Sequence, residues 1–273
     1  MEKTLRLNRR GFIGMLSGAA AIRVSGMPIP SVEWRKEANG KRWFNMTDWD
    51  KCTNVVDDRK LLASLAKVPC YGGLDLAAVS DLTSFVLAWP IKDRVYVYPW
   101  FWLPADDLAD RSKRDGVHYD VWSQQGFVEL TPGNVTDWRF VVDRIKQLKR
   151  LFNIREIAFD RYGARDTVAD LMEAGLEVVD TGQGYISMNA PSKALQELVL
   201  SRKLVHTGHP VLRWNVDCTT VDQDAAGNIK PVKPNRQKGS KRIDGVVALI
   251  MALSRVQAAV KVRKSNYSEI RTL

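Results

Sequence analysis

Apolar positions in the middle of the chain first follow the alternating spacing of strands. The segments 71–77, 83–89 and 94–102 are rich in β-branched and aromatic residues, and short turn-like sequences separate them. Such short connections favour an antiparallel meander of three strands. We therefore expect the central part of the chain to begin with three strands that pair in sequence order.

Beyond this point the pattern changes to alternating helices and strands. A run of apolar residues at helical spacing from Trp138 to Phe152 predicts a helix with one buried face. A compact apolar segment at 154–159 predicts the strand that follows it. Further helices are expected at 164–174, 191–202 and 242–260, and further strands at 176–179, 203–206, 211–216 and 219–222.

The order of these elements predicts the class of fold. Three strands, then alternating helices and strands, then a final helix are typical of an α/β domain with a mixed sheet and helices on both faces. The same order occurs in the ribonuclease H-like architecture. We assign this domain to residues 68–260. Around it we expect a poorly ordered basic arm or signal-like segment at 1–42, a lead-in or linker at 43–67 and a basic tail at 261–273.

Charge is distributed unevenly along the chain. The formal net charge is +10, with nine basic and three acidic residues in 1–42 and eleven basic and two acidic residues from 228 onward. The middle of the chain therefore carries a net charge of −5. Basic flanks around an acidic centre suit a protein that binds phosphate with one surface and cations at another. A basic surface that only confers solubility is compatible with the same numbers.

Composition excludes several classes of protein. No apolar run reaches the roughly 18 residues of a membrane span, so we expect no membrane partner. The three cysteines are scattered, which predicts neither a disulfide framework nor a zinc site and favours a reducing compartment. His206 and His209 lie beside a Gly-His-Pro turn and are interpreted as surface residues.

The first 30 residues carry a separate signal. Arg9 and Arg10 precede a short stretch of small and apolar residues, Gly14 to Ile22, which resembles a twin-arginine export signal. A short helix or a basic arm can imitate the same pattern. Because no later feature indicates a secreted protein, we expect a cytoplasmic location and keep export as the alternative.

Three aspartates lie in or beside apolar segments, where an isolated charge is costly to bury. Asp75 interrupts an apolar strand, Asp160 ends a predicted central strand, and Asp244 opens an apolar helix. Ligands collect at the carboxyl ends of strands in open α/β sheets. Asp244 could instead serve the helix dipole, and Asp160 could be an ordinary turn residue, but Asp75 has no comparable local explanation. Together the three predict a carboxylate cluster.

A carboxylate cluster of this kind suits a hard divalent cation, Mg²⁺ or Mn²⁺. Two such ions, about 3.5–4 Å apart, can activate a water and stabilise the leaving oxygen of a phosphodiester. The aspartates are then metal ligands rather than general bases. A fourth ligand is left open among five further aspartates: Asp81, Asp180, Asp217, Asp222 and Asp224.

Basic and aromatic residues are candidates for binding DNA. Lys241 and Arg242 directly precede Asp244 and are expected to hold phosphates, with a solvated basic turn as the alternative. The aromatic residues at 100–102 could stack on bases, although strand aromatics are more often core residues.

Three segments resemble the nuclease domain of tailed-phage terminase large subunits. Two of them are G-L-D-L-A-A-V-S-D-L-T at 73–83 and I-A-F-D-R-Y-G-A at 157–164. The third begins at Pro210 and contains L-R-W-N-V, D-A-A-G-N-I-K-P and K-R-I-D-G-V-V-A-L, the last at 241–249. The similarity spans about residues 43–260, and the three motifs are specific when they occur together in this order.

The resemblance implies an endonuclease with a ribonuclease H-like fold and two divalent ions, Mg²⁺ or Mn²⁺. Such an enzyme cuts concatemeric viral DNA for packaging in the host cytoplasm. Carried over, the acidic metal ligands of the family fall on Asp75, Asp160 and Asp244. The implied partners are double-stranded DNA, a terminase small subunit, a portal and an ATPase motor. Because the sequence contains no G-x-x-x-x-G-K-[ST] loop, we expect a nuclease part whose motor is separate or lost.

Two other functions fit the same residues. One is a catalytically inactive prophage remnant that only binds DNA or takes part in assembly. The other is a different ribonuclease H-like nuclease of the resolvase or transposase type, which shares the chemistry and differs in substrate.

Overall fold

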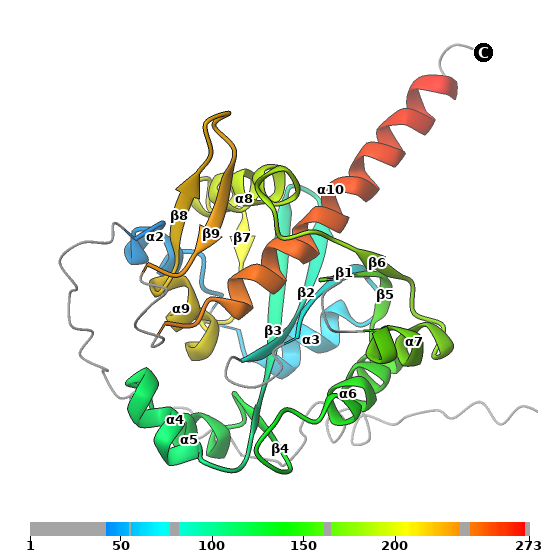
Figure 1. Cartoon of the computed structure of the whole chain (residues 1–273). Coiled ribbons are helices and arrows are strands. Elements are labelled where there is room, and N and C mark those ends of the chain that lie inside the picture. The colour runs from blue at the N-terminus through cyan, green and yellow to red at the C-terminus, as the bar shows by residue number, and fades with distance from the viewer. Residues whose placement is uncertain (1–41, 55, 77–81, 161–164, 235–240, 271–273) are drawn as a thin grey trace, which may run out of the picture.

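A mixed sheet of seven strands forms the centre of the molecule (Figure 1). The computed structural model describes residues 42–54, 56–76, 82–160, 165–234 and 241–270. Within this part of the chain the strand order is β4-β3-β2-β1-β5-β6, and β7 also pairs with β3.

The first three strands form the antiparallel meander predicted from the sequence, and the other strands of the sheet pair in parallel. The mixed α/β sheet of ribonuclease H-like type is thereby confirmed. A separate hairpin of two antiparallel strands, β8 and β9, lies outside the main sheet. The strands are β1 (Pro69–Asp75), β2 (Thr83–Ile91), β3 (Arg94–Pro104), β4 (Glu129–Thr131), β5 (Asn153–Phe159), β6 (Val178–Asp180), β7 (Leu204–Val205), β8 (Thr220–Gln223) and β9 (Ile229–Val232).

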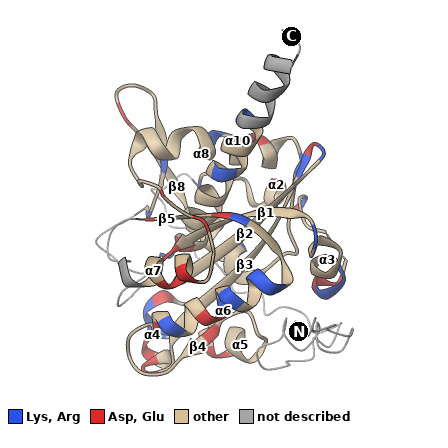
Figure 2. Cartoon of the chain, turned by 90° about the vertical axis from the view of Figure 1, so that its right-hand side faces the viewer, with Lys and Arg blue, Asp and Glu red and all other residues tan. Residues whose placement is uncertain are grey.

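Helices cover both faces of the sheet, as predicted, and each face has its own apolar core. Figure 2 shows charged residues along the helices of the second layer. The first layer contains α2 (Met46–Asp50), α5 (Tyr119–Gln124), α8 (Tyr185–Leu200), α9 (Pro210–Asp217) and α10 (Asp244–Ile270); the second contains α3 (Asp58–Leu65), α6 (Trp138–Leu151) and α7 (Arg165–Glu173).

Strand β2 shows why both cores form. Every residue from Thr83 to Trp89 is buried, so this strand has no solvent-facing side. Val86 and Ala88 belong to the core under α10, whereas Phe85 and Leu87 belong to the core under α6. Alternate residues of a strand point to opposite faces, which divides one apolar run between two cores.

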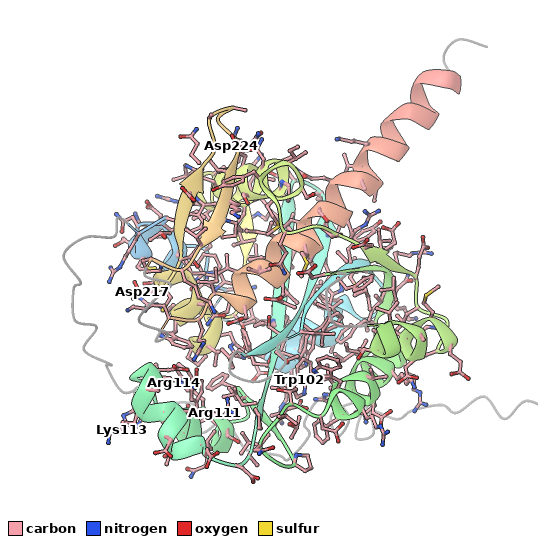
Figure 3. All side chains as sticks on the ribbon, viewed as in Figure 1. Trp102, Arg111, Lys113, Arg114, Asp217 and Asp224 are labelled. Carbon is pink, nitrogen blue, oxygen red and sulfur yellow. The ribbon has the colours of Figure 1, made fainter. Side chains whose placement is uncertain are left out.

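The aromatic residues at 100–102 are core residues. Trp100, Phe101 and Trp102 are buried, and Figure 3 shows Trp102 among the side chains that fill the body of the molecule. The interpretation as core, rather than as a base-stacking surface, therefore fits the structure.

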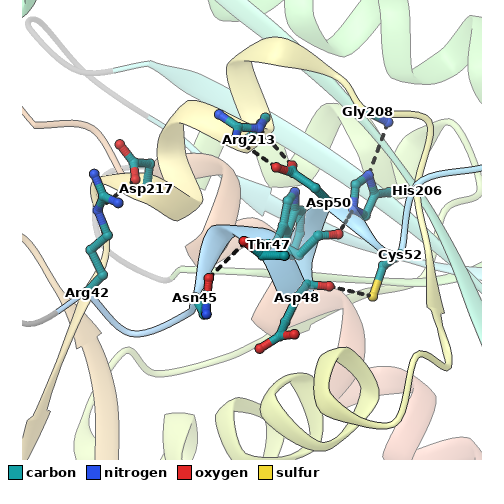
Figure 4. A network of polar contacts seen from close by, with 11 residues as sticks. Arg42, Asn45, Thr47, Asp48, Asp50, Cys52, His206, Gly208, Arg213 and Asp217 are labelled. Atoms are coloured by element: carbon teal, nitrogen blue, oxygen red, sulfur yellow. Dashed lines mark hydrogen bonds and ion pairs between the residues drawn. The ribbon is translucent and has the colours of Figure 1, made fainter. Parts of the chain in front are cut away.

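The described residues between 43 and 67, expected to form a lead-in or linker, pack against the body of the molecule. Trp49 of α2 is fully buried and stacks on His206, with ring centroids 4.4 Å apart. Arg213 holds the same helix from outside through two 2.8 Å hydrogen bonds to Asp50 (Figure 4). Helix α3 buries three leucines in the second core.

Other local predictions are wrong in informative ways. Residues 211–216 form helix α9 rather than a strand, because Pro210 fits the first turn of a helix and the apolar residues are buried on several sides. The helix expected at 191–202 begins at Tyr185, and α10 continues beyond 260 to Ile270. His206 and His209, interpreted as surface residues, are both buried.

The signal-like segment lies outside the described residues, apart from Arg42 at its end, so its export-like pattern stays a prediction. Among the helices that the structure describes, none combines the length and the apolar character needed to cross a membrane.

Candidate functional site

Asp75 and Asp160 lie at the carboxyl ends of two neighbouring parallel strands. Asp75 is the last residue of β1, and Asp160 directly follows the last residue of β5. The register pairs Leu74 with Phe159, so the two aspartates come next in their strands at the same end of the sheet.

Strand geometry also gives the two aspartates the same face. Phe159 packs in the core under α6, whereas Ala158 packs in the core under α10. Because alternate residues share a face, Asp160 follows Ala158 to the side of α10. Asp75 lies two residues after Gly73, whose backbone lies close to α10, so Asp75 faces the same side of the sheet.

Gly73 allows α10 to lie directly on β1. A Cβ atom at this position would lie 1.9 Å from the carbonyl oxygen of Ala248 and 2.6 Å from the backbone nitrogen of Ala252. Only glycine leaves room for the helix backbone at this distance. Asp244 lies one turn before Ala248 on the same helix face, so α10 carries this third aspartate towards the end of β1.

The pKa of Asp75 reports how closely the three carboxylates interact. Although the residue keeps part of its surface exposed, burial raises its pKa well above the usual value, and the negative charges of Asp244 and Asp160 raise it further. A 3.2 Å hydrogen bond from Gln183 Nε2 to Asp75 Oδ1 and the positive charge of Lys233 lower it. The fold thus brings all three predicted aspartates into one electrostatic environment.

Gln183 and Lys233 belong to this site, and the sequence analysis did not identify them. Gln183 lies between β6 and α8, and Lys233 directly follows β9. Packing of α8 and the hairpin brings both residues near Asp75, and no spacing rule predicts that packing. The basic run after residue 228 was the one available signal for Lys233.

Asp180 lies at the same end of the sheet but belongs to the other face. The register pairs it with Phe159, whose ring packs under α6. Neighbouring residues in register share a face, so Asp180 is directed away from α10. It does not suit the position of a fourth ligand.

Most of the other competing aspartates have structural partners. Asp217 forms a 2.8 Å ion pair with Arg42, and Asp222 accepts a 2.7 Å hydrogen bond from a tyrosine hydroxyl. Asp224 accepts hydrogen bonds within the turn of the β8–β9 hairpin, and Figure 3 shows it beside that hairpin. Asp81 lies outside the described residues.

Arg242, expected to hold DNA phosphate, is buried in an ion pair instead. Its guanidinium donates to the carboxylate of Asp115 at 2.9 and 2.8 Å, and only 5% of its side chain is exposed. A guanidinium enclosed in this way is poorly placed to meet a DNA backbone, so we assign it an internal role. Lys241 is partly exposed, and a phosphate contact stays a prediction for this residue alone.

The side chains of the site are of the type that binds a hard divalent cation. Carboxylate oxygens are the ligands that Mg²⁺ and Mn²⁺ prefer. Within the described part of the chain, however, no group of three histidine, cysteine, aspartate or glutamate side chains is arranged to hold a metal ion. The three aspartates therefore interact electrostatically without forming a closed coordination sphere.

Comparison with known proteins places the chain in a family. The family model for the terminase large subunit, endonuclease domain, matches residues 18–259. The large terminase subunit of Enterobacteria phage HK97 is 36% identical over 202 residues, which cover 73% of this chain and 40% of that protein. Protein YmfN of Escherichia coli (strain K12) is 29% identical over 223 residues, which cover 78% and 48%.

The fold agrees with this assignment. The crystal structure of the HK97 bacteriophage large terminase is similar with a TM-score of 0.70 at 33% identity, over 79% of this chain and 43% of that one. The chain spans less than half the length of these relatives. The matched residues include the sheet, both cores, the two aspartates at strand ends and Asp244 at the start of α10. The chain belongs to the endonuclease-domain family of terminase large subunits.

Proposed function

We propose that this chain is a metal-dependent DNA endonuclease. The observation that supports the proposal is that Asp75 and Asp160 follow paired residues at the ends of neighbouring strands, and that burial and then the charges of Asp244 and Asp160 raise the pKa of Asp75. Neighbouring like charges favour a bound cation, which reduces their repulsion.

In this proposal the three aspartates would hold two divalent ions, Mg²⁺ or Mn²⁺. Such ions supply an activated water and stabilise the leaving oxygen of the phosphodiester. Gln183 orients the Asp75 carboxylate through its hydrogen bond, and Lys233 adds a positive charge that suits a nearby DNA phosphate.

We further propose that the substrate is concatemeric double-stranded phage DNA, cut for packaging in the host cytoplasm. Membership of the terminase family supports this role, with a small subunit, a portal and an ATPase motor as partners. The sequence contains no phosphate-binding loop of the G-x-x-x-x-G-K-[ST] type, so the ATPase activity is assigned to residues outside it.

Cleavage of supercoiled plasmid in the presence of Mn²⁺ tests the nuclease proposal. Asp75→Asn and Asp160→Asn are each expected to lower the cleavage rate by about 100-fold or more, because each removes a charged metal ligand. Addition of EDTA to the wild-type chain is expected to abolish cleavage in the same way.

Asp180→Asn is the matched control, since Asp180 ends a neighbouring strand at the same end of the sheet but on the opposite face. This variant is expected to cut within about threefold of the wild-type rate. Undiminished cutting by Asp75→Asn would refute the assignment. DNA binding without any metal-stimulated cutting would identify a non-catalytic module, and a preference for branched junctions would indicate a resolvase-type enzyme.

A further inference from the structure

The chain segment that enters α10 is attached to helix α4 (Leu108–Asp115). Arg242 lies two residues before Asp244, and its Nε and Nη2 donate to the two carboxylate oxygens of Asp115 at 2.9 and 2.8 Å. Both side chains are almost fully enclosed, with 5% of the arginine and 1% of the aspartate exposed. A two-pronged ion pair of this kind fixes both distance and orientation.

Asp115 is itself held by further donors. The Tyr119 hydroxyl donates to Asp115 Oδ2 at 2.9 Å, and Arg114 Nε donates to Asp115 Oδ1 at 2.9 Å. Burial and the charge of Asp115 raise the pKa of Tyr119, so its hydroxyl stays protonated as a donor. Figure 3 shows Arg111 and Arg114 on α4, the helix that ends with Asp115. The carboxylate that receives Arg242 is therefore rigidly placed.

A second contact holds the other side of Asp244. The backbone N–H of Gly245 donates to Asn215 Oδ1 of α9 at 2.7 Å. A Cβ atom at position 245 would lie 2.7 Å from Phe101 Cζ and 2.8 Å from the same Asn215 oxygen, so the helix start is pressed against β3 and α9. Asp244 thus lies between two neighbours that different elements hold in place.

The energetics of this arrangement favour a role in positioning over one in stability. The free-energy cost of removing two charges from water offsets most of the attraction between them. A buried ion pair therefore contributes little net stability compared with apolar residues of the same size. What it does supply is a defined geometry. Metal ligands need such definition, since a productive site tolerates errors of only about 0.5 Å.

We propose that Asp115 is a positioning residue that, through Arg242, sets the carboxylate of Asp244 for metal binding at the strand ends. The inference rests on the proposed nuclease function, because Asp244 requires this precision as a metal ligand. Asp115 itself touches neither metal nor DNA in this scheme, and α4 becomes a support of the site.

The test replaces the ion pair by apolar residues of similar size in Asp115→Leu/Arg242→Met. Three quantities are measured: the Mn²⁺ concentration for half-maximal plasmid cleavage, the melting temperature, and hydrogen exchange of the amides at 244–248. We expect the Mn²⁺ requirement to rise about tenfold and exchange to become faster. The melting temperature is expected to fall about as far as in the control pair described below, because the buried Tyr119 hydroxyl loses its acceptor.

The pair formed by Arg144 and Glu129 provides a matched control on the opposite face of the sheet. Arg144 Nε lies 3.0 Å from Glu129 Oε1, the side chains are 7% and 19% exposed, and Trp102 Nε1 donates to the same carboxylate at 3.1 Å. Glu129→Leu/Arg144→Met therefore removes an equivalent group of charges. Its Mn²⁺ requirement is expected to stay within about twofold of the wild-type value.

Tyr119→Phe is a milder variant in case the double substitution does not fold. It removes one hydroxyl from Asp115 and leaves the ion pair, so a rise of about threefold in the Mn²⁺ requirement is expected. An unchanged Mn²⁺ requirement in the foldable variants, together with unchanged exchange at 244–248, overturns the proposal.

Failure of the nuclease function is a separate result. It would appear as a wild-type chain without Mn²⁺-stimulated cleavage, whereas amide exchange requires no activity. In that event, faster exchange at 244–248 in Asp115→Leu/Arg242→Met but not in the control pair still supports positioning of Asp244 by Asp115, and equal exchange refutes it.

Discussion

Asp75 occupies a position at which burial makes a charge costly. It ends a strand that is otherwise largely buried, and two further aspartates raise its pKa. Arg242 shows the opposite situation, since its charge is matched by a carboxylate at hydrogen-bond distance. The contrast separates two roles at the residue scale. A group of neighbouring carboxylates suits a cation, whereas a carboxylate paired with a guanidinium holds the backbone.

His206 is a buried neutral residue whose titration is expected to affect stability. Its Nδ1 accepts a hydrogen bond from the Gly208 N–H at 3.1 Å, so the proton is assigned to Nε2, which lies 2.9 Å from the carbonyl oxygen of Trp49 (Figure 4). Burial lowers the pKa of His206 to about 4. A second ring proton would face the Gly208 N–H without an acceptor.

We predict that the free energy of unfolding falls by about 3 kcal/mol as the pH drops from 6.5 to 4, through this residue alone. Between these values the unfolded imidazole binds protons that the folded one does not, so stability is fully present above pH 6.5. Urea unfolding across this range measures the effect. His206→Gln lacks the titrating group, and an identical pH profile in that variant would contradict the prediction.

Contact between β1 and α10 is the element-scale feature on which the site depends. We predict that Gly73→Ala lowers the free energy of unfolding by about 3 kcal/mol, because its Cβ atom would collide with the backbone of α10 and force the helix away. The displacement also moves Asp244 away from Asp75, so cleavage is expected to fall even in the folded fraction. Chemical denaturation and the plasmid assay measure the two effects.

Gly184→Ala is the control for this substitution. A Cβ atom at position 184 meets nothing within 4 Å, and the backbone there has an ordinary φ of −77°. Gly184→Ala is therefore expected to lower the free energy of unfolding by less than about 1 kcal/mol. Equal destabilisation by the two substitutions would show that the close approach at Gly73 is not what limits stability.

Net charge is the property of the whole molecule that bears on its substrate. The chain carries a formal charge of +10, and Figure 2 shows Lys and Arg on several elements, among them α3 and α6. Binding through such residues releases counterions from DNA and therefore weakens as salt increases. This term depends on how many phosphates the Lys and Arg residues neutralise rather than on the three aspartates.

We predict that duplex DNA binding by Asp75→Asn, used to prevent cleavage, weakens about 10³-fold between roughly 50 and 200 mM NaCl. Fluorescence anisotropy with two unrelated duplexes of equal length measures the effect, and both duplexes are expected to show the same slope. Binding that is independent of salt would refute the role assigned to the net charge.

Local patterns predicted the parts of the fold in which neighbouring residues decide the outcome. The strands expected at 71–77, 83–89 and 94–102 correspond to β1, β2 and β3, because alternation and short turns are local properties. Helix α9 was missed because its residues are buried on most sides, which removes the amphipathic pattern. Helix α8 starts early because Asn189 and Tyr185 bond to the β8–β9 hairpin, a contact the sequence does not reveal.

Sequence alone therefore determined which residues could carry charge chemistry: three aspartates at the ends of apolar segments, where burial without a partner is costly. The tertiary structure decided which of the other charged residues join them. It brought Gln183 and Lys233 to Asp75, directed Asp180 to the opposite face, and gave Arg242 a partner 127 residues away. The physical reason is the distance along the sequence over which each property is decided. Strand and helix periodicity depends on residues that are close in sequence, whereas the partner of a buried charge depends on how distant elements pack.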